Sequence, residues 1–173
     1  NNFRAIAPLF LDLFPNLLTL HWGWSQMSSI SGEALARVPK LQYLNLRNNR
    51  VSSLTNTPFS ALSHLEHLDI SSNGLRALHA SEFDTLTRLT TLNVTDNPLT
   101  SLDAGIFEPL TKLQRLYMAG TRLASLHARA LDTNRELVHL DLFDNRLSHL
   151  PSGFFHHLTR LTFLDLSNNN IGS

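Results

Sequence analysis

The chain has 173 residues, enough for one domain with a sizeable core, and its 42% hydrophobic and 16% charged content excludes a disordered chain. Fourteen lysines and arginines balance fourteen aspartates and glutamates, so the net charge gives no argument for nucleic-acid or membrane-surface binding. Cysteine is absent, and no apolar run approaches the length of a membrane span.

A 24-residue pattern recurs along the whole chain. Its clearest copy begins at Leu65 and ends at Arg88, and the pattern restarts at Leu17, Leu41, Leu89, Leu113, Leu137 and Leu161. Apolar residues at fixed positions of a fixed period are typical of a solenoid. We therefore predict a single array over residues 1–173, cut from a longer chain. It has a partial repeat at 1–16, repeats starting at 17, 41, 65, 89, 113 and 137, and a partial repeat at 161–173.

The first part of each repeat alternates apolar and polar residues, as around Leu68, which predicts a short strand with one buried face. Position 9, counted from the first leucine, is usually Asn, whose side-chain amide can satisfy backbone groups where the chain leaves the strand. Stacked repeats align these residues in one column: Asn1, Ser25, Asn49, Asn73, Asn97, Thr121, Asn145 and Asn169. We expect weak points at Ser25 and Thr121, because a hydroxyl group makes fewer of these bonds.

The second part of each repeat returns the chain to the next strand. Phe83, Leu86 and Leu89 are spaced i, i+3, i+6, which predicts one or two tight helical turns. Position 19 should form a second buried column, made of Phe59, Phe83, Phe107 and Phe155, with Leu11, Leu35 and Leu131 as smaller substitutes. Asn134 falls at an apolar position, and we expect its side chain to bond locally or to turn outward.

Parallel strands about 4.8 Å apart, backed by wider packing, force curvature. The predicted fold is therefore an α/β solenoid shaped as a horseshoe, with a parallel sheet on the concave face and short helical turns or loops on the convex face.

These residues make the pattern resemble the leucine-rich repeat family over the whole chain, with seven strand-forming copies in strict register. A 24-residue period with Phe at position 19 resembles the extracellular class of animals, which includes Toll-like receptors, small proteoglycans, neuronal adhesion proteins and secreted insect immune proteins. The Asn-rich and His-rich repeats are most similar to the insect immune members. That class usually has cysteine-rich caps, which this sequence lacks. We expect either that the natural chain continues at both ends or that its termini are disordered.

The outward strand positions of the repeat are 3, 5, 7 and 8, and they lean acidic. They hold Asp69, Asp96, Asp141, Asp144 and Asp165 against Arg47 and Arg115. Phe143 lies between Ala119 and Ser167 in its column, so we expect most of its ring to be exposed at the centre of an apolar patch. Exposed aromatics beside arginine are typical of interface hot spots, although strands favour aromatics in any case. The predicted partner-binding residues are Arg115, Tyr117, His139, Asp141, Phe143, Phe163 and Asp165.

Other chemistry is weakly indicated. The pairs His67 with Asp69 and His139 with Asp141 offer two ligands each, too few for zinc. Asp141 and Asp165 should face each other across adjacent strands, which is unfavourable for like charges, but too few oxygen ligands surround them for calcium.

Two further motifs concern catalysis and modification. Ser71, His67 and Asp69 share a strand face, but their side chains should point in parallel, so we predict no catalytic residue, no metal and no cofactor. Asn93-Val94-Thr95 is the only glycosylation tripeptide, and Asn93 would carry a glycan if the chain is secreted. A chance tripeptide is the alternative.

The predicted function is a non-enzymatic protein-recognition module, extracellular as a secreted protein or a cell-surface ectodomain, with an innate-immune or receptor role. The expected partner is a protein ligand or co-receptor and no nucleic acid. The uncapped ends could also self-associate. The alternative is an intracellular scaffold or a substrate-targeting domain of a larger enzyme. Membrane attachment stays open.

Overall fold

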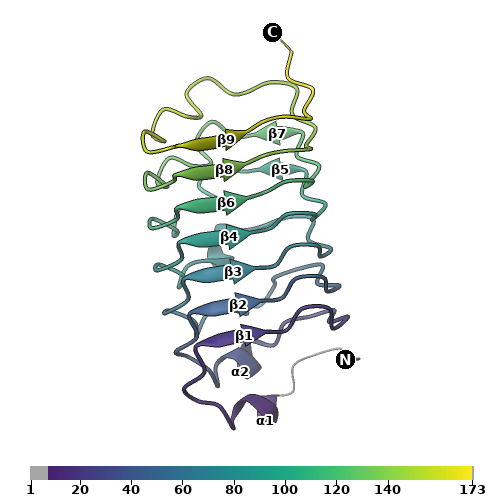
Figure 1. Ribbon diagram of the computed structural model, residues 1–173, viewed down its shortest axis with the longest axis vertical. Coiled ribbons are helices and arrows are strands. Elements are labelled where there is room, and N and C mark those ends of the chain that lie inside the picture. Colours follow the sequence, from purple (N-terminus) through teal and green to yellow (C-terminus); the bar gives the residue numbers. More distant parts are fainter. Residues whose placement is uncertain (1–7, 173) are drawn as a thin grey trace.

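The computed structural model describes residues 8–172, so Asn1 of the predicted column lies outside the described residues. Figure 1 shows a stack of coils, each of which places one short strand in a common sheet. The strands of this sheet are β1 (Thr19–His21), β2 (Tyr43–Asn45), β3 (His67–Asp69), β4 (Thr91–Asn93), β6 (Arg115–Tyr117), β8 (His139–Asp141) and β9 (Phe163–Asp165).

The sheet is parallel throughout, in the order β1-β2-β3-β4-β6-β8-β9. Each strand pairs with the strand that lies one repeat further along the chain, so that Leu44 pairs with Leu68 and Leu68 with Leu92. The predicted solenoid with its parallel sheet is confirmed, and the predicted strand register is correct for all seven strands.

Helical structure is limited to short turns on the side opposite the sheet. The elements are α1 (Pro8–Leu11), α2 (Gly32–Leu35) and the 3₁₀ turn η1 (Ala80–Glu82). The Ser31 hydroxyl begins α2 by accepting a 3.1 Å hydrogen bond from the Ala34 N–H. Bonds from the Leu86 N–H to the Phe83 carbonyl and from the Leu89 N–H to the Leu86 carbonyl confirm tight turns in the return segment. Within the described residues, every helix is too short to span a bilayer.

A second, two-stranded sheet was not predicted. It joins β5 (Ser101–Leu102) to β7 (Ser125–Leu126) and lies behind β8 and β9 in Figure 1. Within the described residues it spans two repeats, and the return segments of the other repeats form no strand at this position.

The core fills the space between the sheet and the return segments. Phe59, Phe83 and Phe107 are fully buried in the predicted second column, and so are its smaller members Leu11, Leu35 and Leu131. Phe155 is a correction, since it is only partly buried and Phe154 is buried in its place. Phe154 occupies position 18, which also faces the core. No further return segment follows in the described chain to cover Phe155.

The asparagine column ties neighbouring coils together. The Asn97 Oδ1 atom accepts a 3.0 Å bond from the Leu75 N–H one repeat back, and its Nδ2 donates to the Ile70 and Val94 carbonyls at 3.0 and 2.9 Å. The same exchange recurs at Asn49, Asn73, Asn145 and Asn169. The amide therefore performs the backbone-pairing role expected of the column.

The two hydroxyl members of the column disturb the backbone beside them. The Thr121 hydroxyl reaches the Met118 carbonyl at 2.9 Å but makes no bond to the preceding repeat. The following residues, Gln26 after Ser25 and Arg122 after Thr121, have φ angles of 59° and 63°. A left-handed backbone costs a non-glycine residue about 1–2 kcal/mol. This strain supports the expected weak points at Ser25 and Thr121.

Asn134 is fully buried, so the expectation that it turns outward or bonds locally is wrong. Its Nδ2 donates across the repeat boundary to the carbonyls of Phe107 at 3.0 Å and Leu110 at 2.8 Å. Its Oδ1 is buried with no hydrogen-bond partner. The amide fits at an apolar position because two return-segment carbonyls of the preceding coil point at it.

Candidate functional site

The outward surface of the seven-stranded sheet, called the sheet face here, has a backbone requirement at position 5. An Asn or Asp at this position accepts a hydrogen bond of 2.9–3.0 Å from the N–H two residues further on. This turn supports the chain as it leaves the strand. The residues concerned are Asn45, Asp69, Asn93, Asp141 and Asp165. His21 and Tyr117 hold this position in the other two strands and have no such oxygen.

Position 8 has a second requirement, a left-handed backbone. Its φ angles lie between 51° and 62° in all seven copies, which suits the Asn, Asp, Ser and Gly residues found there. Trp24 is the exception, because a bulky side chain in this conformation is strained. Its side chain is also 74% exposed.

The predicted binding residues are brought together on β6, β8 and β9, although not in the predicted arrangement. Tyr117, His139 and Phe163 form a continuous stack, called the C-terminal stack here. The ring centroids of Tyr117 and His139 are 4.8 Å apart, and those of His139 and Phe163 are 4.0 Å apart with nearly parallel planes. His139 therefore stands at the centre of the patch, where we had placed Phe143.

Phe143 lies in a different column of the sheet face, just after β8. It is 42% exposed, so more of it is covered than its small neighbours Ala119 and Ser167 led us to expect. Among the described rings, it makes no contact with the C-terminal stack. Phe163 is 44% exposed at the end of that stack. The surface thus offers two exposed phenylalanines on neighbouring strands.

The charges around the stack are held by hydrogen bonds within the chain. Asp141 and Asp165 pair across β8 and β9 as predicted. The Ser167 hydroxyl and N–H both donate to Asp165 and hold the pKa of its carboxyl group below its ordinary value. The Phe143 N–H donates to Asp141 at 3.0 Å. These hydrogen bonds partly offset the expected repulsion between the two carboxylates.

The environment of His139 favours its neutral form. Partial burial in the stack lowers the pKa of its imidazole, while Asp141 raises it and Arg115 lowers it further. Within the described residues, no three His, Cys, Asp or Glu side chains gather closely enough to hold a metal ion. The sheet face can therefore offer flat aromatic surface and fixed carboxylates, which suits contact with another molecule.

Three features of the surface escaped the sequence reasoning. Ser71, placed on the outward face, is 2% exposed because its hydroxyl donates to Asp69 at 2.6 Å. A second stack, the N-terminal stack, joins His21, Tyr43 and His67 with centroid distances of 5.1 and 5.8 Å. Its signal was present, because these rings occupy positions 3 and 5 of successive strands, as the residues of the C-terminal stack do. The strained and exposed Trp24 was missed as well.

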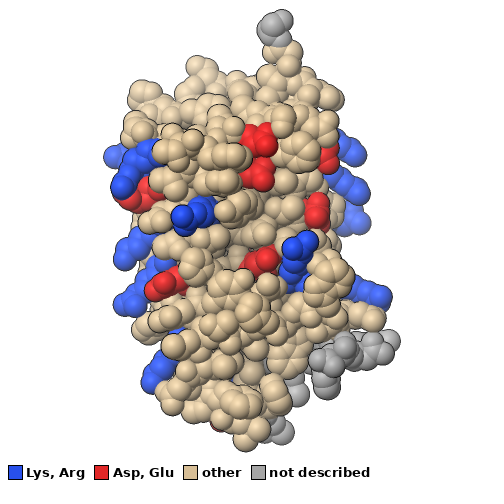
Figure 2. Space-filling model, in the orientation of Figure 1, with Lys and Arg blue, Asp and Glu red and all other residues tan. Residues whose placement is uncertain are grey.

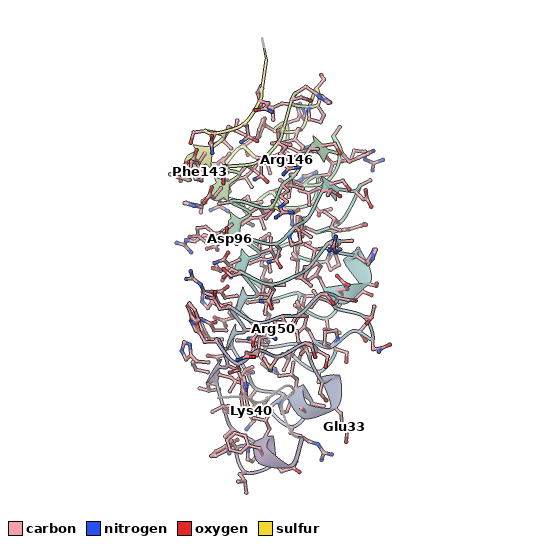
Figure 3. The ribbon with its side chains drawn as sticks, turned by 90° about the vertical axis from the view of Figure 1, so that its right-hand side faces the viewer. Glu33, Lys40, Arg50, Asp96, Phe143 and Arg146 are labelled. Atoms are coloured by element: carbon pink, nitrogen blue, oxygen red, sulfur yellow. The ribbon has the colours of Figure 1, made fainter. Side chains whose placement is uncertain are left out.

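Charge is distributed in stripes despite the neutral total. In Figure 2, most Lys and Arg lie along both lateral margins of the sheet face, and Asp and Glu lie both in its middle and near the margins. In Figure 3, Phe143 lies on the sheet side, while Arg50 and Arg146 lie on the margin that faces the viewer. A partner of the sheet face therefore meets an acidic surface with aromatic rings.

Comparison with known proteins agrees with this architecture. A family model described as a leucine rich repeat matches residues 39–99, 87–147 and 111–171. A search of curated protein sequences finds no match.

Two solved structures illustrate the structural similarity. One is described as the crystal structure of a TLR13–ssRNA13 complex. It has a TM-score of 0.75 and 27% identity, and the alignment covers 92% of this chain and 26% of that one. The other is the leucine-rich repeat protein LIC12759 of Leptospira interrogans, with a TM-score of 0.79 and 21% identity, covering 98% of this chain and 47% of that one. The chain thus spans about a quarter and about half of the lengths of these two proteins.

Proposed function

Because the chain belongs to the leucine-rich repeat family, whose repeats form protein-interaction modules, we propose that its sheet face binds a protein partner through the C-terminal stack and Phe143. The observation that carries this proposal is the exposed Phe143 on the same face as the stacked rings of Tyr117, His139 and Phe163. Aromatic side chains near arginine dominate the binding energy of many protein interfaces.

The repeat that begins at Leu113 supports this assignment because it departs from the backbone rules of the array. Tyr117 replaces the Asn or Asp that supports the turn at position 5, and Thr121 replaces the column asparagine. Arg122, the residue after Thr121, is left-handed, as Gln26 is after Ser25. Local rules are most often broken at functional sites. The repeat from Leu17 departs in the same way, with His21 and Ser25. The repeat from Leu113 is the one of the two that presents Arg115 and contributes Tyr117 to the C-terminal stack.

The charge of the sheet face favours a protein over a nucleic acid at this surface. Its outward positions carry five aspartates and two arginines, and Asp141 and Asp165 lie directly beside the stack. Phosphate groups would be repelled there. The structural similarity to TLR13 in its complex with single-stranded RNA concerns a different and much longer protein. We propose a partner with basic and apolar groups, such as a protein ligand or co-receptor.

The partner test compares two equally drastic truncations on one sheet. The chain is immobilised, and extracellular proteins that bind it are identified and measured one at a time. Phe143→Ala should weaken the true partner about 30-fold, the equivalent of about 2 kcal/mol. Trp24→Ala removes a more exposed ring from the far end of the sheet and should change the affinity less than about twofold. The proposal fails if Phe143→Ala and Phe163→Ala both leave every partner unaffected.

Stability must be measured on the same variants. Phe143 is more than one-third exposed, so its truncation should lower the free energy of unfolding by about 1 kcal/mol or less. A larger loss would mean that the ring is a packing residue and that any loss of binding is indirect.

An extracellular location with an innate-immune or receptor role is a further part of the proposal, and the 27% identity to TLR13 is its support. Glycosylation of Asn93 offers a direct test of secretion. Asn93 is half-buried in the sheet, and its Oδ1 accepts the Thr95 N–H at 3.0 Å. Asn93→Asp keeps this bond, as Asp69 and Asp141 do, but removes the glycan acceptor. Secreted wild-type protein should lose mass on deglycosylation, and the variant should not.

A further inference from the structure

One margin of the solenoid carries a row of unpaired arginines that the sheet-face proposal does not use. In the repeats from Leu17 onward, positions 9 to 14, where each coil leaves the sheet, contain four arginines and no aspartate or glutamate. Arg4 holds position 12 of the partial repeat 1–16 and lies outside the described residues. We call the four described arginines the arginine rim: Arg50, Arg76, Arg122 and Arg146. All four are exposed, and no member takes part in the ion pairs found within the described chain.

The rim is straight and long. Arg50, Arg122 and Arg146 occupy the same position of their repeats, and Arg76 lies two residues further on in its own. Four repeats separate Arg50 from Arg146, which is about 19 Å along the stack at about 4.8 Å per strand. Figure 3 shows these two residues on the same margin of the molecule.

A hollow interrupts the rim at the repeat that has Pro98 in place of an arginine. Its volume is about 440 Å³, and Arg76 and Arg122 line it together with Pro98, Asp96 and Gly120. A Cβ atom on Gly120 would lie 2.6 Å from the Asp96 Oδ1 atom, so a side chain here would displace this carboxylate. Two guanidinium groups and one carboxylate thus share a single recess.

Arg122 is held in this recess at a conformational cost. Its φ angle of 63° is one that glycine or asparagine adopts with far less strain. An arginine that is exposed, strained and without an ion-pair partner contributes little to folding. Strain at such a position is evidence for a role in recognition.

We infer that the arginine rim binds a linear sulfated polysaccharide along the solenoid axis, with one sulfated sugar unit seated in the hollow between Arg76 and Arg122. Guanidinium groups bind tetrahedral anionic groups through paired N–H donors. Asp96 repels anions but accepts hydrogen bonds from hydroxyl groups. A ligand that carries sulfates and hydroxyls side by side satisfies both kinds of group.

The composition of the rim disfavours single-stranded RNA. Proteins that bind it combine basic grooves with aromatic side chains on which bases stack. In the repeats from Leu17 onward, positions 9 to 14 contain no Phe, Tyr or Trp. Among the described residues at these positions, Ile171 in the last coil is the exposed large apolar residue, too little to insert into a lipid surface.

The test measures binding of a fluorescent heparin oligosaccharide by anisotropy over a range of salt concentrations. Four phosphate-like contacts give a logarithmic salt slope of about 3, so a fourfold rise in salt should weaken binding about 60-fold. The rim variant replaces all four arginines by glutamine: Arg50→Gln, Arg76→Gln, Arg122→Gln and Arg146→Gln. It should lose most of this slope, and selectively desulfated heparin should bind the wild type weakly.

The opposite margin supplies a control of equal charge. The control variant is Lys40→Gln, Arg88→Gln, Lys112→Gln and Arg160→Gln. It also removes four positive charges. Two of these residues already have partners, since Lys40 bonds Asn16 and Arg160 pairs with Glu136. It should keep the wild-type affinity within about threefold and the wild-type salt slope. Circular dichroism melts of both variants verify that each is folded.

Three outcomes would overturn the inference. The first is no binding by wild type, and the second is an equal loss in both variants, which would indicate a general charge effect. The third is equally tight binding of oligouridylate with the same dependence on the rim, which would assign the surface to RNA. Phe143→Ala should leave heparin binding unchanged, so failure of the sheet-face proposal does not affect this result.

Discussion

The asparagine column allows a quantitative comparison between two neighbouring substitutions, Asn73→Ala and Asn97→Ala. Each removes a side-chain amide that accepts one hydrogen bond from a backbone N–H of the preceding repeat. The donor is the Val51 N–H for Asn73 and the Leu75 N–H for Asn97. Each loss leaves one backbone donor unpaired, which costs about 1–3 kcal/mol when it is buried.

The carbonyl acceptors make the two variants unequal. Asn73 Nδ2 donates to the Leu46 and Ile70 carbonyls, which also accept from Asn49 and Asn97. These carbonyls stay paired when Asn73 is truncated. The Val94 carbonyl accepts from Asn97, and the next member of the column is a threonine whose hydroxyl bonds Met118 instead.

Asn97→Ala therefore leaves two buried groups unpaired and Asn73→Ala only one. Asn97 is also fully buried, whereas water can reach the half-buried Asn73. We expect losses in the free energy of unfolding of about 2 kcal/mol for Asn73→Ala and about 4 kcal/mol for Asn97→Ala. Urea denaturation followed by circular dichroism measures both. Equal losses, or a larger loss at Asn73, would refute the reasoning from shared acceptors.

Three further predictions follow from single side chains. Asn134→Leu should be neutral or stabilising by about 1 kcal/mol, because the Phe107 and Leu110 carbonyls keep their backbone bonds and an unpaired oxygen is removed; a large loss in a thermal melt would contradict this. Trp24→Asn should raise the free energy of unfolding by about 1 kcal/mol in urea denaturation by relieving its left-handed strain, and an unchanged value would mean that the indole contributes packing that offsets it. Burial lowers the pKa of His139, so its contribution to stability is present above the unfolded pKa of about 6.5 and lost as the pH falls through the folded pKa. The variant His139→Phe can retain the stack and has no group that titrates. Its melting temperature should therefore fall less than that of wild type between about pH 7.5 and pH 5, and an equal fall would contradict a lowered pKa of His139.

The repeating leucines and asparagines were enough to predict the fold, because period and register together determine which residues face the core. They do not determine how side chains on one face arrange themselves. Tyr117 at position 5 meets His139 at position 3 diagonally, and His139 meets Phe163 directly across β8 and β9, so the stack is centred on His139 instead of Phe143. The burial of Asn134 depends on carbonyls of another coil, which periodicity alone does not reveal.

Some information about the sheet face was present in the sequence and could have been used. The repeated Asn or Asp at position 5 indicates a side chain bonded to its own turn, and Asn, Asp, Ser or Gly at position 8 indicates a left-handed residue. We interpreted the aspartates only as charges. Asp69, Asp141 and Asp165 in fact have a structural bond as well as a charge.

The geometry of positions 5 and 8 also limits how this surface can diversify. Of the four outward positions in each coil, one supports the turn and one must accept a left-handed backbone. Substitutions at positions 3 and 7 change what the sheet presents without removing either support. A randomised library built on positions 3 and 7 should therefore yield mostly folded variants with new specificities, whereas one built on positions 5 and 8 should yield mostly destabilised chains.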